Sequence, residues 1–387
     1  MDNFPYIAVT TLQGLEEVLQ NELTALGAEN AEIQSRAVTV SYTPEMVYKI
    51  NMFCRTGLRV LLPFHSFKAE NNDQLYEEAK KIDWEKYLKP QGTFVFDFSG
   101  RSSHFTHLQF ASLKIKDALC DLMREKHGKR PSVDKMRPDA RFVIHFHEDD
   151  VRISIDTSGQ SLHIRNTRSQ RNEAPMSEVL AAGMIRLSGW DPATPFADYM
   201  CGTGTLLMEA YAFATDMAPC LHRTEYAFMR FDDFNQELYY QYKTEARKRR
   251  KRLETRIFGG DIDAKSVQVS QTNLETMGAL RDVEMVRGDF NKIKAPMKKG
   301  LLMMNPPYGL RIGDNVEELY QNIGSTLKNQ FSGWTAWILS GNPEAMKQIG
   351  LKPSAKITLL NGNIECKFAK FELFEGSLKE FKSIENE

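Results

Sequence analysis

Cysteine is scarce in this sequence, and its few cysteines are scattered. None of the five stands in a CxxC pair, so the sequence indicates neither a disulfide framework nor a zinc or iron–sulfur cluster. No apolar run approaches the ~20 residues that a membrane span requires. The segment MDNFPYIAV has neither the basic region nor the apolar stretch of a signal peptide. We therefore expect a cytoplasmic protein with reduced thiols and no membrane partner.

A large net charge is also lacking. The formal charge is −1, so a nucleic-acid partner would have to be held by local basic patches. The chain has 387 residues, of which 42% are apolar, and it exceeds the ~250–300 residues that one hydrophobic core usually spans. We expect two or three globular units, and composition alone does not indicate what they do.

The C-terminal half has the pattern of a parallel α/β sheet. From about residue 195, longer helical patterns alternate with short apolar runs, namely PFADYM, RIFGGD, VEMVRGD, LLMM, WTAWILS and ITLL. Four of these runs lead into a polar residue: Asp198, Asp261, Asp289 and Asn305. Ligands of open α/β sheets bind outside the carboxyl ends of the strands, so these residues predict the rim of one site.

A β-hairpin is predicted near the end of the chain. The segment ITLLNGNIECKFAKFEL has two β-rich runs around Asn361-Gly362, a pair that favours a tight turn with positive φ at both residues. The parallel sheet therefore gains an antiparallel strand.

The first ~160 residues have a different, mixed α+β pattern. Helical segments such as GLEEVLQNELTALG and FASLKIKDALCDLMREKHG are interleaved with alternating runs such as RFVIHFH and DVRISIDTS. The polar, arginine-containing stretch at residues 160–175 is interpreted as a connector.

A glycine-containing loop follows the first strand of the C-terminal half. In ADYMCGTGTLLMEA, Gly202 and Gly204 separate the strand from a helix that begins near Thr205, which lets a ligand approach the backbone and the helix N-terminus. The third glycine of the dinucleotide fingerprint is missing. Asp261 could accept hydrogen bonds from the two ribose hydroxyls, and Asp289 from an adenine amine. Together they favour an adenosyl ligand without a pyrophosphate.

The tetrapeptide Asn305-Pro306-Pro307-Tyr308 ends an apolar run. Two prolines fix φ and remove backbone donors, so the Asn305 side-chain oxygen and the Pro306 carbonyl can face a ligand as rigid acceptors. Such acceptors suit an exocyclic amino group, which they would hold in line with an electrophilic methyl group. Tyr308 would stack on the base that carries this amine.

These motifs resemble a known family. The glycine loop, GGDID, GDF and NPPYG, in this order, resemble class I S-adenosylmethionine-dependent methyltransferases that modify amino groups. The upstream segment NEAPMSEVLAAGMIRLSGW is similar to the entry helix of THUMP-containing RNA guanine-N2 methyltransferases, the RlmL-like group that modifies 23S rRNA. The resemblance covers nearly the whole chain.

The resemblance implies a fold and a domain order. It implies a ferredoxin-like domain at residues 1–64, a THUMP RNA-binding domain at 65–160 and a linker at 161–176. A Rossmann-like class I methyltransferase domain would follow at 177–387, with a mostly parallel seven-stranded sheet and a terminal antiparallel hairpin.

The resemblance also implies the cofactor, the partner and the site. The cofactor would be S-adenosyl-L-methionine, and the acceptor the N2 amine of a guanosine in 23S rRNA or in an early large-subunit assembly intermediate. The catalytic residues would be Asn305, Pro306, Pro307 and Tyr308. The cofactor-binding residues would be Asp198, Cys201, Gly202, Thr203, Gly204, Asp261, Asp289 and Asn305.

Several alternatives stay open at this point. Adenine-N6 methylation of RNA or DNA and methylation of a glutamine amide would present the same planar NH₂ group, and an idle RNA-binding module could keep the same fold. No metal is expected, because His145 and His147 have no third ligand in view. The basic run at residues 247–252 suits phosphates or a solvated helix face equally, and Phe228, Phe231 and Phe234 favour core packing over base stacking.

Overall fold

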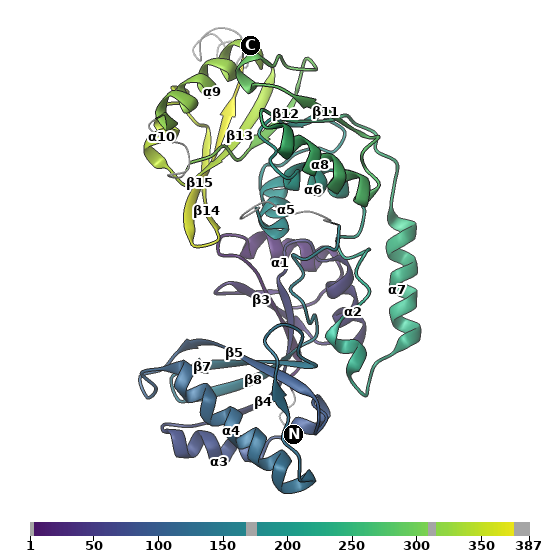
Figure 1. Ribbon diagram of the computed structural model, residues 1–387, viewed down its shortest axis with the longest axis vertical. Helices are drawn as coiled ribbons and strands as arrows, with labels where there is room; N and C mark the ends of the chain where they lie inside the picture. The colour runs from purple at the N-terminus through teal and green to yellow at the C-terminus, as the bar shows by residue number, and fades with distance from the viewer. Residues whose placement is uncertain (1–3, 168–175, 309–314, 375–387) are drawn as a thin grey trace. The chain divides into compact units, whose positions relative to one another are not determined.

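The computed structural model describes residues 4–167, 176–308 and 315–374, and the chain divides into two compact units (Figure 1). The first unit contains Met1–Thr11, Leu19–Leu162 and Arg223–Glu245. The second contains Leu12–Val18, His163–His222 and Ala246–Glu387. Residues 223–245 are thus grouped with the N-terminal half, whereas the sequence-based boundaries assign them to the C-terminal domain. Those boundaries stay a prediction.

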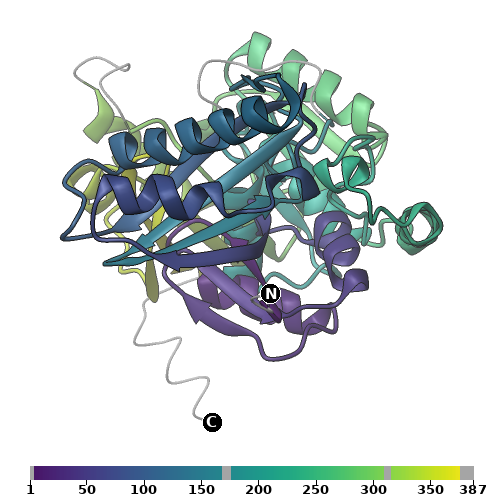
Figure 2. The same cartoon turned by 90° about the horizontal axis from the view of Figure 1, so that it is seen from below.

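The first unit is built on a mixed eight-stranded sheet in the order β2-β3-β1-β4-β8-β7-β5-β6. The strands are β1 (Tyr6–Thr10), β2 (Glu32–Gln34), β3 (Ala37–Ser41), β4 (Arg59–Lys68), β5 (Thr93–Arg101), β6 (Ser132–Val133), β7 (Ala140–His147) and β8 (Asp150–Asp156). The helical segments are α1 (Glu16–Ala25), which belongs to this unit from Leu19 onward, α2 (Pro44–Phe53), α3 (Asn72–Lys80), η1 (Trp84–Lys86), α4 (Leu108–His127) and η2 (Ala227–Arg230). Helices α3 and α4 lie side by side over the sheet (Figure 2). The mixed α+β pattern is confirmed.

The second unit contains the predicted seven-stranded sheet, in the order β11-β10-β9-β12-β13-β15-β14. Its strands are β9 (Phe196–Asp198), β10 (Ile257–Asp261), β11 (Val283–Arg287), β12 (Gly300–Met304), β13 (Trp334–Ser340), β14 (Ala355–Asn361) and β15 (Ile364–Glu372). Its helical segments are α5 (Glu178–Leu187), α6 (Thr205–Ala214), α8 (Ala264–Met277), η3 (Phe290–Lys292), α9 (Val316–Gln330) and α10 (Pro343–Lys347), and α7 (Gln236–Arg249) connects the two units in sequence.

Strands β9 to β13 pair in parallel, and β15 is antiparallel to both β13 and β14. The apolar runs are nearly continuous because helices cover both faces of this sheet. On one face Leu207 of α6 fills the space beside Gly259, and on the other Tyr320 and Ile323 of α9 pack with Leu302. The Rossmann-like architecture and the antiparallel hairpin are therefore confirmed.

The hairpin turn differs from the prediction by one residue. Asn361 pairs with Ile364 as the last residue of β14, so Gly362 and Asn363 form the turn. Of these, Gly362 has a positive φ of 63°, which fits a turn with glycine at its first central position. Asn361 is therefore a strand residue, and its side chain is available for another role.

Candidate functional site

The four predicted rim residues follow neighbouring strands at one edge of the second unit's sheet. Asp289, Asp261, Asp198 and Asn305 follow or end β11, β10, β9 and β12, which is the order of these strands in the sheet. The Gly288 N–H donates to the Asp261 carbonyl at 3.1 Å, which brings the ends of β11 and β10 together. The topology thus places all four residues along a single edge.

The glycine loop is held against the end of β10 by two hydrogen bonds that its backbone N–H groups donate. The Cys201 N–H donates to the Gly260 carbonyl at 3.0 Å, and the Gly202 N–H donates to Asp261 Oδ2 at 2.9 Å. Gly202 and Gly204 have positive φ values of 52° and 81°, which side chains other than glycine rarely adopt. A Cβ at Gly204 would also lie 2.3 Å from the hydroxyl of Ser270. The loop therefore needs glycine at both positions.

Asp261 has a fixed carboxylate orientation. Its Oδ2 accepts from Gly202, and its Oδ1 accepts from the Asp263 N–H at 3.0 Å. A carboxylate oxygen can accept more than one hydrogen bond, so both oxygens keep acceptor capacity for a ligand. Asp261 can therefore receive two adjacent hydroxyl donors without reorienting.

Asp198 and Cys201 are buried, and burial raises the pKa of both side chains. Burial, and then the nearby Asp261 carboxylate, hold the pKa of Asp198 well above its ordinary value, although the Met200 N–H opposes this shift. Burial, together with Asp198 and Asp261, likewise raises the pKa of the Cys201 thiol. A protonated thiol is a poor nucleophile, so Cys201 contributes to the shape of the loop rather than to covalent chemistry.

Asn305 presents an acceptor that the described residues leave open. Its Oδ1 atom is buried and has no hydrogen-bond donor in the part of the chain that the structure describes. The neighbouring Pro306 is buried and has no N–H to offer. A buried acceptor left unpaired costs about 1–3 kcal/mol, so this atom is an indication of a donor supplied by a ligand.

Tyr308 is half-buried, and its hydroxyl is already bonded within the protein. Asn361 Nδ2 donates to the Tyr308 hydroxyl at 2.8 Å, and Cys366 Sγ lies 3.6 Å from the same oxygen. Burial, and then the Cys366 contact, raise the pKa of Tyr308 to about 12, so the hydroxyl stays protonated near neutral pH. The ring, rather than the hydroxyl, is the part of Tyr308 that remains for a ligand.

Comparison with known proteins identifies this set of motifs. Residues 165–370 match the model described as RMKL-like, methyltransferase domain, residues 69–156 match the THUMP domain, and residues 6–61 match the RlmL ferredoxin-like domain. The chain belongs to the RMKL-like methyltransferase family. It is a SAM-dependent RNA methyltransferase, and S-adenosyl-L-methionine is its cofactor.

Relatives of this methyltransferase cover nearly its whole length. A Synechocystis sp. protein with a provisional RNA methyltransferase name, slr0064, is 35% identical over 96% of this chain and 97% of its own. Ribosomal RNA large subunit methyltransferase K/L of Syntrophotalea carbinolica is 35% identical over 95% of this chain, which spans only 53% of that protein. The crystal structure of SMU.472, provisionally described as a methyltransferase and complexed with SAH, is 26% identical, covers 96% and 99% of the two chains, and has a TM-score of 0.84.

The methyltransferase residues at the sheet edge fit an adenosyl cofactor. The loop has positive-φ glycines, and a Cβ at Gly202 would meet nothing within 4 Å, so this side of the loop is open to a ligand. Ile262, which follows Asp261, is 65% exposed and offers an apolar surface next to the carboxylate. The sequence patterns above do not predict a role for Ile262, although it stands out as the apolar residue between the two acids of GGDID.

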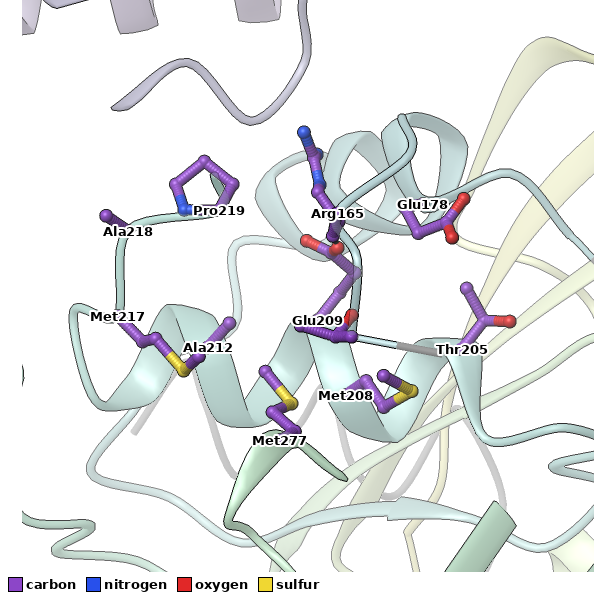
Figure 3. A pocket seen from close by; sticks show the side chains of 11 residues that line it. Arg165, Glu178, Thr205, Met208, Glu209, Ala212, Met217, Ala218, Pro219 and Met277 are labelled. Atoms are coloured by element: carbon purple, nitrogen blue, oxygen red, sulfur yellow. Dashed lines mark hydrogen bonds and ion pairs between the residues drawn. The ribbon is translucent and has the colours of Figure 1, made fainter. Parts of the chain in front are cut away.

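A separate small cavity lies against the first turns of α6 in the second unit (Figure 3). Its volume is about 10 Å³, the room of about one water molecule. Arg165 and Glu209 line it as a buried ion pair, with Arg165 Nε 3.3 Å from Glu209 Oε1. The four rim residues do not line this cavity, and it is far too small for the cofactor. Arg165, which falls in the predicted linker, is thus part of a buried ionic contact; residues 168–175 lie outside the described residues.

The other candidates of the sequence have structural partners. Phe228 and Phe231 are buried in the first unit, where the ring centroids of Phe228 and Tyr226 lie 4.9 Å apart, whereas Phe234 is half-buried. Core packing is therefore confirmed for Phe228 and Phe231. In the basic run, Arg249 pairs with Asp216 at 3.2 Å. His145 Nδ1 lies 3.0 Å from the Ser99 hydroxyl. Among the described residues, no helix combines the length and apolar composition needed to cross a membrane.

Proposed function

We propose that this methyltransferase modifies the exocyclic N2 amine of one guanosine in 23S rRNA. The THUMP match supports an RNA substrate, and the large-subunit name of the Syntrophotalea carbinolica relative supports rRNA. Guanine is the base that the resemblance to the guanine-N2 group implies. Because a base buried in a finished subunit would also have to leave tertiary contacts, we further propose that the enzyme acts before the subunit is fully assembled.

The open acceptor of Asn305 is the observation that carries the amino-group assignment. Asn305 Oδ1 is buried beside a proline that has no N–H, so a donor from the substrate would satisfy it. The Pro306 carbonyl is the second acceptor in this proposal. An exocyclic NH₂ supplies two N–H donors in one plane, and two acceptors fix the direction of its nitrogen.

The residues of the rim then have separate roles. S-adenosyl-L-methionine, when bound, supplies an electrophilic methyl group. Asp261 would accept from the ribose hydroxyls, and Asp289 from the adenine amine. Asn305 and Pro306 would hold the target amine and stabilise the positive charge that develops on its nitrogen. The nitrogen becomes acidic as it is alkylated and would release one proton to water, so no general base is required.

The remaining site residues complete this assignment. Asp198, Cys201, Gly202, Thr203 and Gly204 would form the cofactor loop, Pro307 would stiffen the turn, and Tyr308 would stack on the base. The Asn273 side chain donates to the Thr203 carbonyl at 3.1 Å, so α8 supports the loop from behind. Ile262 would pack on the adenine ring.

Nucleoside analysis tests the proposal directly. Deproteinised 23S rRNA from cells lacking this protein is incubated with the enzyme and labelled S-adenosylmethionine, digested and separated. We expect label in N2-methylguanosine, and more of it on free rRNA than on finished large subunits. Label in N6-methyladenosine would contradict the guanine assignment and spare the amino-group chemistry, whereas label only on DNA or protein would contradict the RNA substrate.

Two variants of Asn305 test the acceptor. Asn305→Ala removes the oxygen, so turnover should be lost while the affinity for S-adenosylhomocysteine stays near that of the wild type. Asn305→Asp keeps an acceptor oxygen and should retain part of the turnover. Normal turnover of Asn305→Ala would remove the role proposed for this side chain.

A further inference from the structure

Tyr308 has a polar and a steric support outside its own tetrapeptide, besides the Cys366 Sγ that lies 3.6 Å from its hydroxyl. One is polar: the Asn361 amide donates to the Tyr308 hydroxyl at 2.8 Å. The other is steric: a Cβ at Gly341 would lie 2.7 Å from Tyr308 Cε2 and 2.9 Å from Cδ2. Asn361 ends β14 and Gly341 follows β13, so two elements of the second unit, both distant in sequence from residues 305–308, contact the ring.

The contact to Asn361 is not a by-product of the hairpin turn. Gly362 and Asn363 form that turn, and Asn361 lies in a regular pair with Ile364. Strand ends tolerate many residue types, and asparagine is depleted in strands. The amide at position 361 is therefore explained by the hydrogen bond that it donates.

The space beside Tyr308 is also specific. Gly341 has no positive φ, so its backbone does not require glycine. Only the closeness of its neighbours, the Tyr308 ring and the Ile364 side chain at 2.7 Å, excludes a methyl group. Glycine at this position allows one edge of the ring, Cδ2 and Cε2, to lie close to the backbone beyond β13.

We propose that Asn361 and Gly341 are positioning residues that set the Tyr308 ring at the angle at which it receives the target base. The inference rests on the proposed function, because it assigns the stacking surface of that reaction. Asn361 holds the hydroxyl end and Gly341 admits the ring edge, so the ring keeps one orientation before the base arrives. The terminal hairpin thus takes part in presenting the substrate.

Kinetics on 23S rRNA test the polar support. Asn361→Ala removes one hydrogen bond, so kcat/KM for RNA should fall about two- to tenfold, with unchanged affinity for S-adenosylhomocysteine by calorimetry. Asn363→Ala, in the exposed turn two residues further along the chain, is the matched control and should retain wild-type kinetics. Full kcat/KM in folded Asn361→Ala would overturn the inference.

A double-mutant cycle separates positioning from general stability. Tyr308→Phe removes the same hydrogen bond from its other end, together with the Cys366 contact, and it serves alone if Asn361→Ala does not fold. In the Tyr308→Phe background, Asn361→Ala should cause no further loss of kcat/KM. Additive losses would mean that Asn361 acts elsewhere and would overturn the inference.

The steric support has its own test. Gly341→Ala places a methyl group against the ring, and a misplacement of about 1 Å can lower turnover up to about 100-fold. We expect a loss larger than that of Asn361→Ala, again with unchanged S-adenosylhomocysteine affinity. Wild-type turnover of Gly341→Ala would refute the steric role.

Fluorine NMR provides a readout that is independent of activity. With 3-fluorotyrosine at position 308, the wild-type ring should give the broader signal, and Asn361→Ala should narrow it by freeing the ring. An unchanged fluorine linewidth in Asn361→Ala would overturn the proposal that Asn361 restrains the Tyr308 ring, even if RNA is the substrate. Conversely, if the wild type methylates no rRNA while Asn361→Ala still narrows the fluorine signal, the proposed function is wrong, but the restraint of the Tyr308 ring by Asn361 is confirmed.

Discussion

Replacing Asp261 tests the cofactor site most directly, because its carboxylate accepts hydrogen bonds from the loop and is proposed to accept them from the cofactor. It accepts from the Gly202 and Asp263 N–H groups at 2.9 and 3.0 Å, and it is proposed to accept from the ribose hydroxyls. Asp261→Ala removes both sets of hydrogen bonds. Asp261→Asn keeps one acceptor oxygen but replaces the other with an NH₂ group that faces a backbone donor.

The expected loss of affinity follows from the charge of the lost acceptor. A hydrogen bond to a charged group is worth about 1.5–3 kcal/mol, which corresponds to about a 10- to 150-fold weaker Kd. The two backbone N–H groups lie near solvent and can bind water, so the loss of fold stability should be smaller than the loss of affinity. Asp261→Asn should fall between Asp261→Ala and the wild type.

Calorimetric titration with S-adenosylhomocysteine measures the Kd, and thermal unfolding without ligand shows whether each variant is folded. Glu275→Gln is the control, because this exposed glutamate on α8 carries the same charge in the same unit. A folded Asp261→Ala protein that binds S-adenosylhomocysteine as tightly as the wild type would refute the ribose assignment.

Three further substitutions test the second unit without using activity. Leu15→Ala should lower the free energy of unfolding in denaturant by about 2–5 kcal/mol, because the fully buried Leu15 fills the space beside Gly183; no loss would contradict that packing. Arg165→Met should cost about 3–5 kcal/mol by removing the cation that pairs with the buried Glu209 carboxylate, and adding Glu209→Leu should recover part of this loss in the same assay. Burial raises the pKa of Asp198 in the folded state. The free energy of unfolding of the wild type is therefore unaffected at pH values below the unfolded-state pKa and falls as the pH rises through that pKa. The difference in Tm between Asp198→Asn and the wild type should thus increase as the pH rises from about 4 towards neutrality. A difference in Tm that does not change with pH would refute the raised pKa of Asp198.

Local sequence patterns were sufficient to predict the sheet of the second unit. Its strands are buried on both faces, so each appears as a short apolar run, and the parallel arrangement brings their polar ends to one edge. The Asn-Gly pair correctly predicted a hairpin, but its turn lies one residue later, at Gly362 and Asn363. Register depends on which residues pair across the strands, and a dipeptide does not determine this.

Contacts between distant residues could not be predicted in this way. The basic run suggested phosphate binding or a solvated face, yet Arg250 donates to the Tyr211 hydroxyl at 2.8 Å and to the Gly278 carbonyl at 3.1 Å. Arg165 stands in a polar stretch typical of a connector, but its partner Glu209 lies on α6. In each case the deciding group is far away in the chain, and the local composition does not name it.

The NPPY turn shows where local and distant information meet. Its prolines and its asparagine predict rigid acceptors from the sequence alone, because φ restriction and missing donors are properties of the residues themselves. That Asn305 Oδ1 has no donor among the described residues, whereas the Tyr308 hydroxyl already has Asn361, depends on the surrounding fold. Because the Asn305 oxygen is open, Asn305 can accept a hydrogen bond from the target amine. Because the Tyr308 hydroxyl is already bonded, only the ring of Tyr308 is left to stack on the base. Tyr308→Phe should therefore lose little more turnover than Asn361→Ala, whereas Tyr308→Ala, which lacks the ring, should lose far more. Equal losses of turnover in Tyr308→Phe and Tyr308→Ala would show that the hydroxyl itself acts on the substrate.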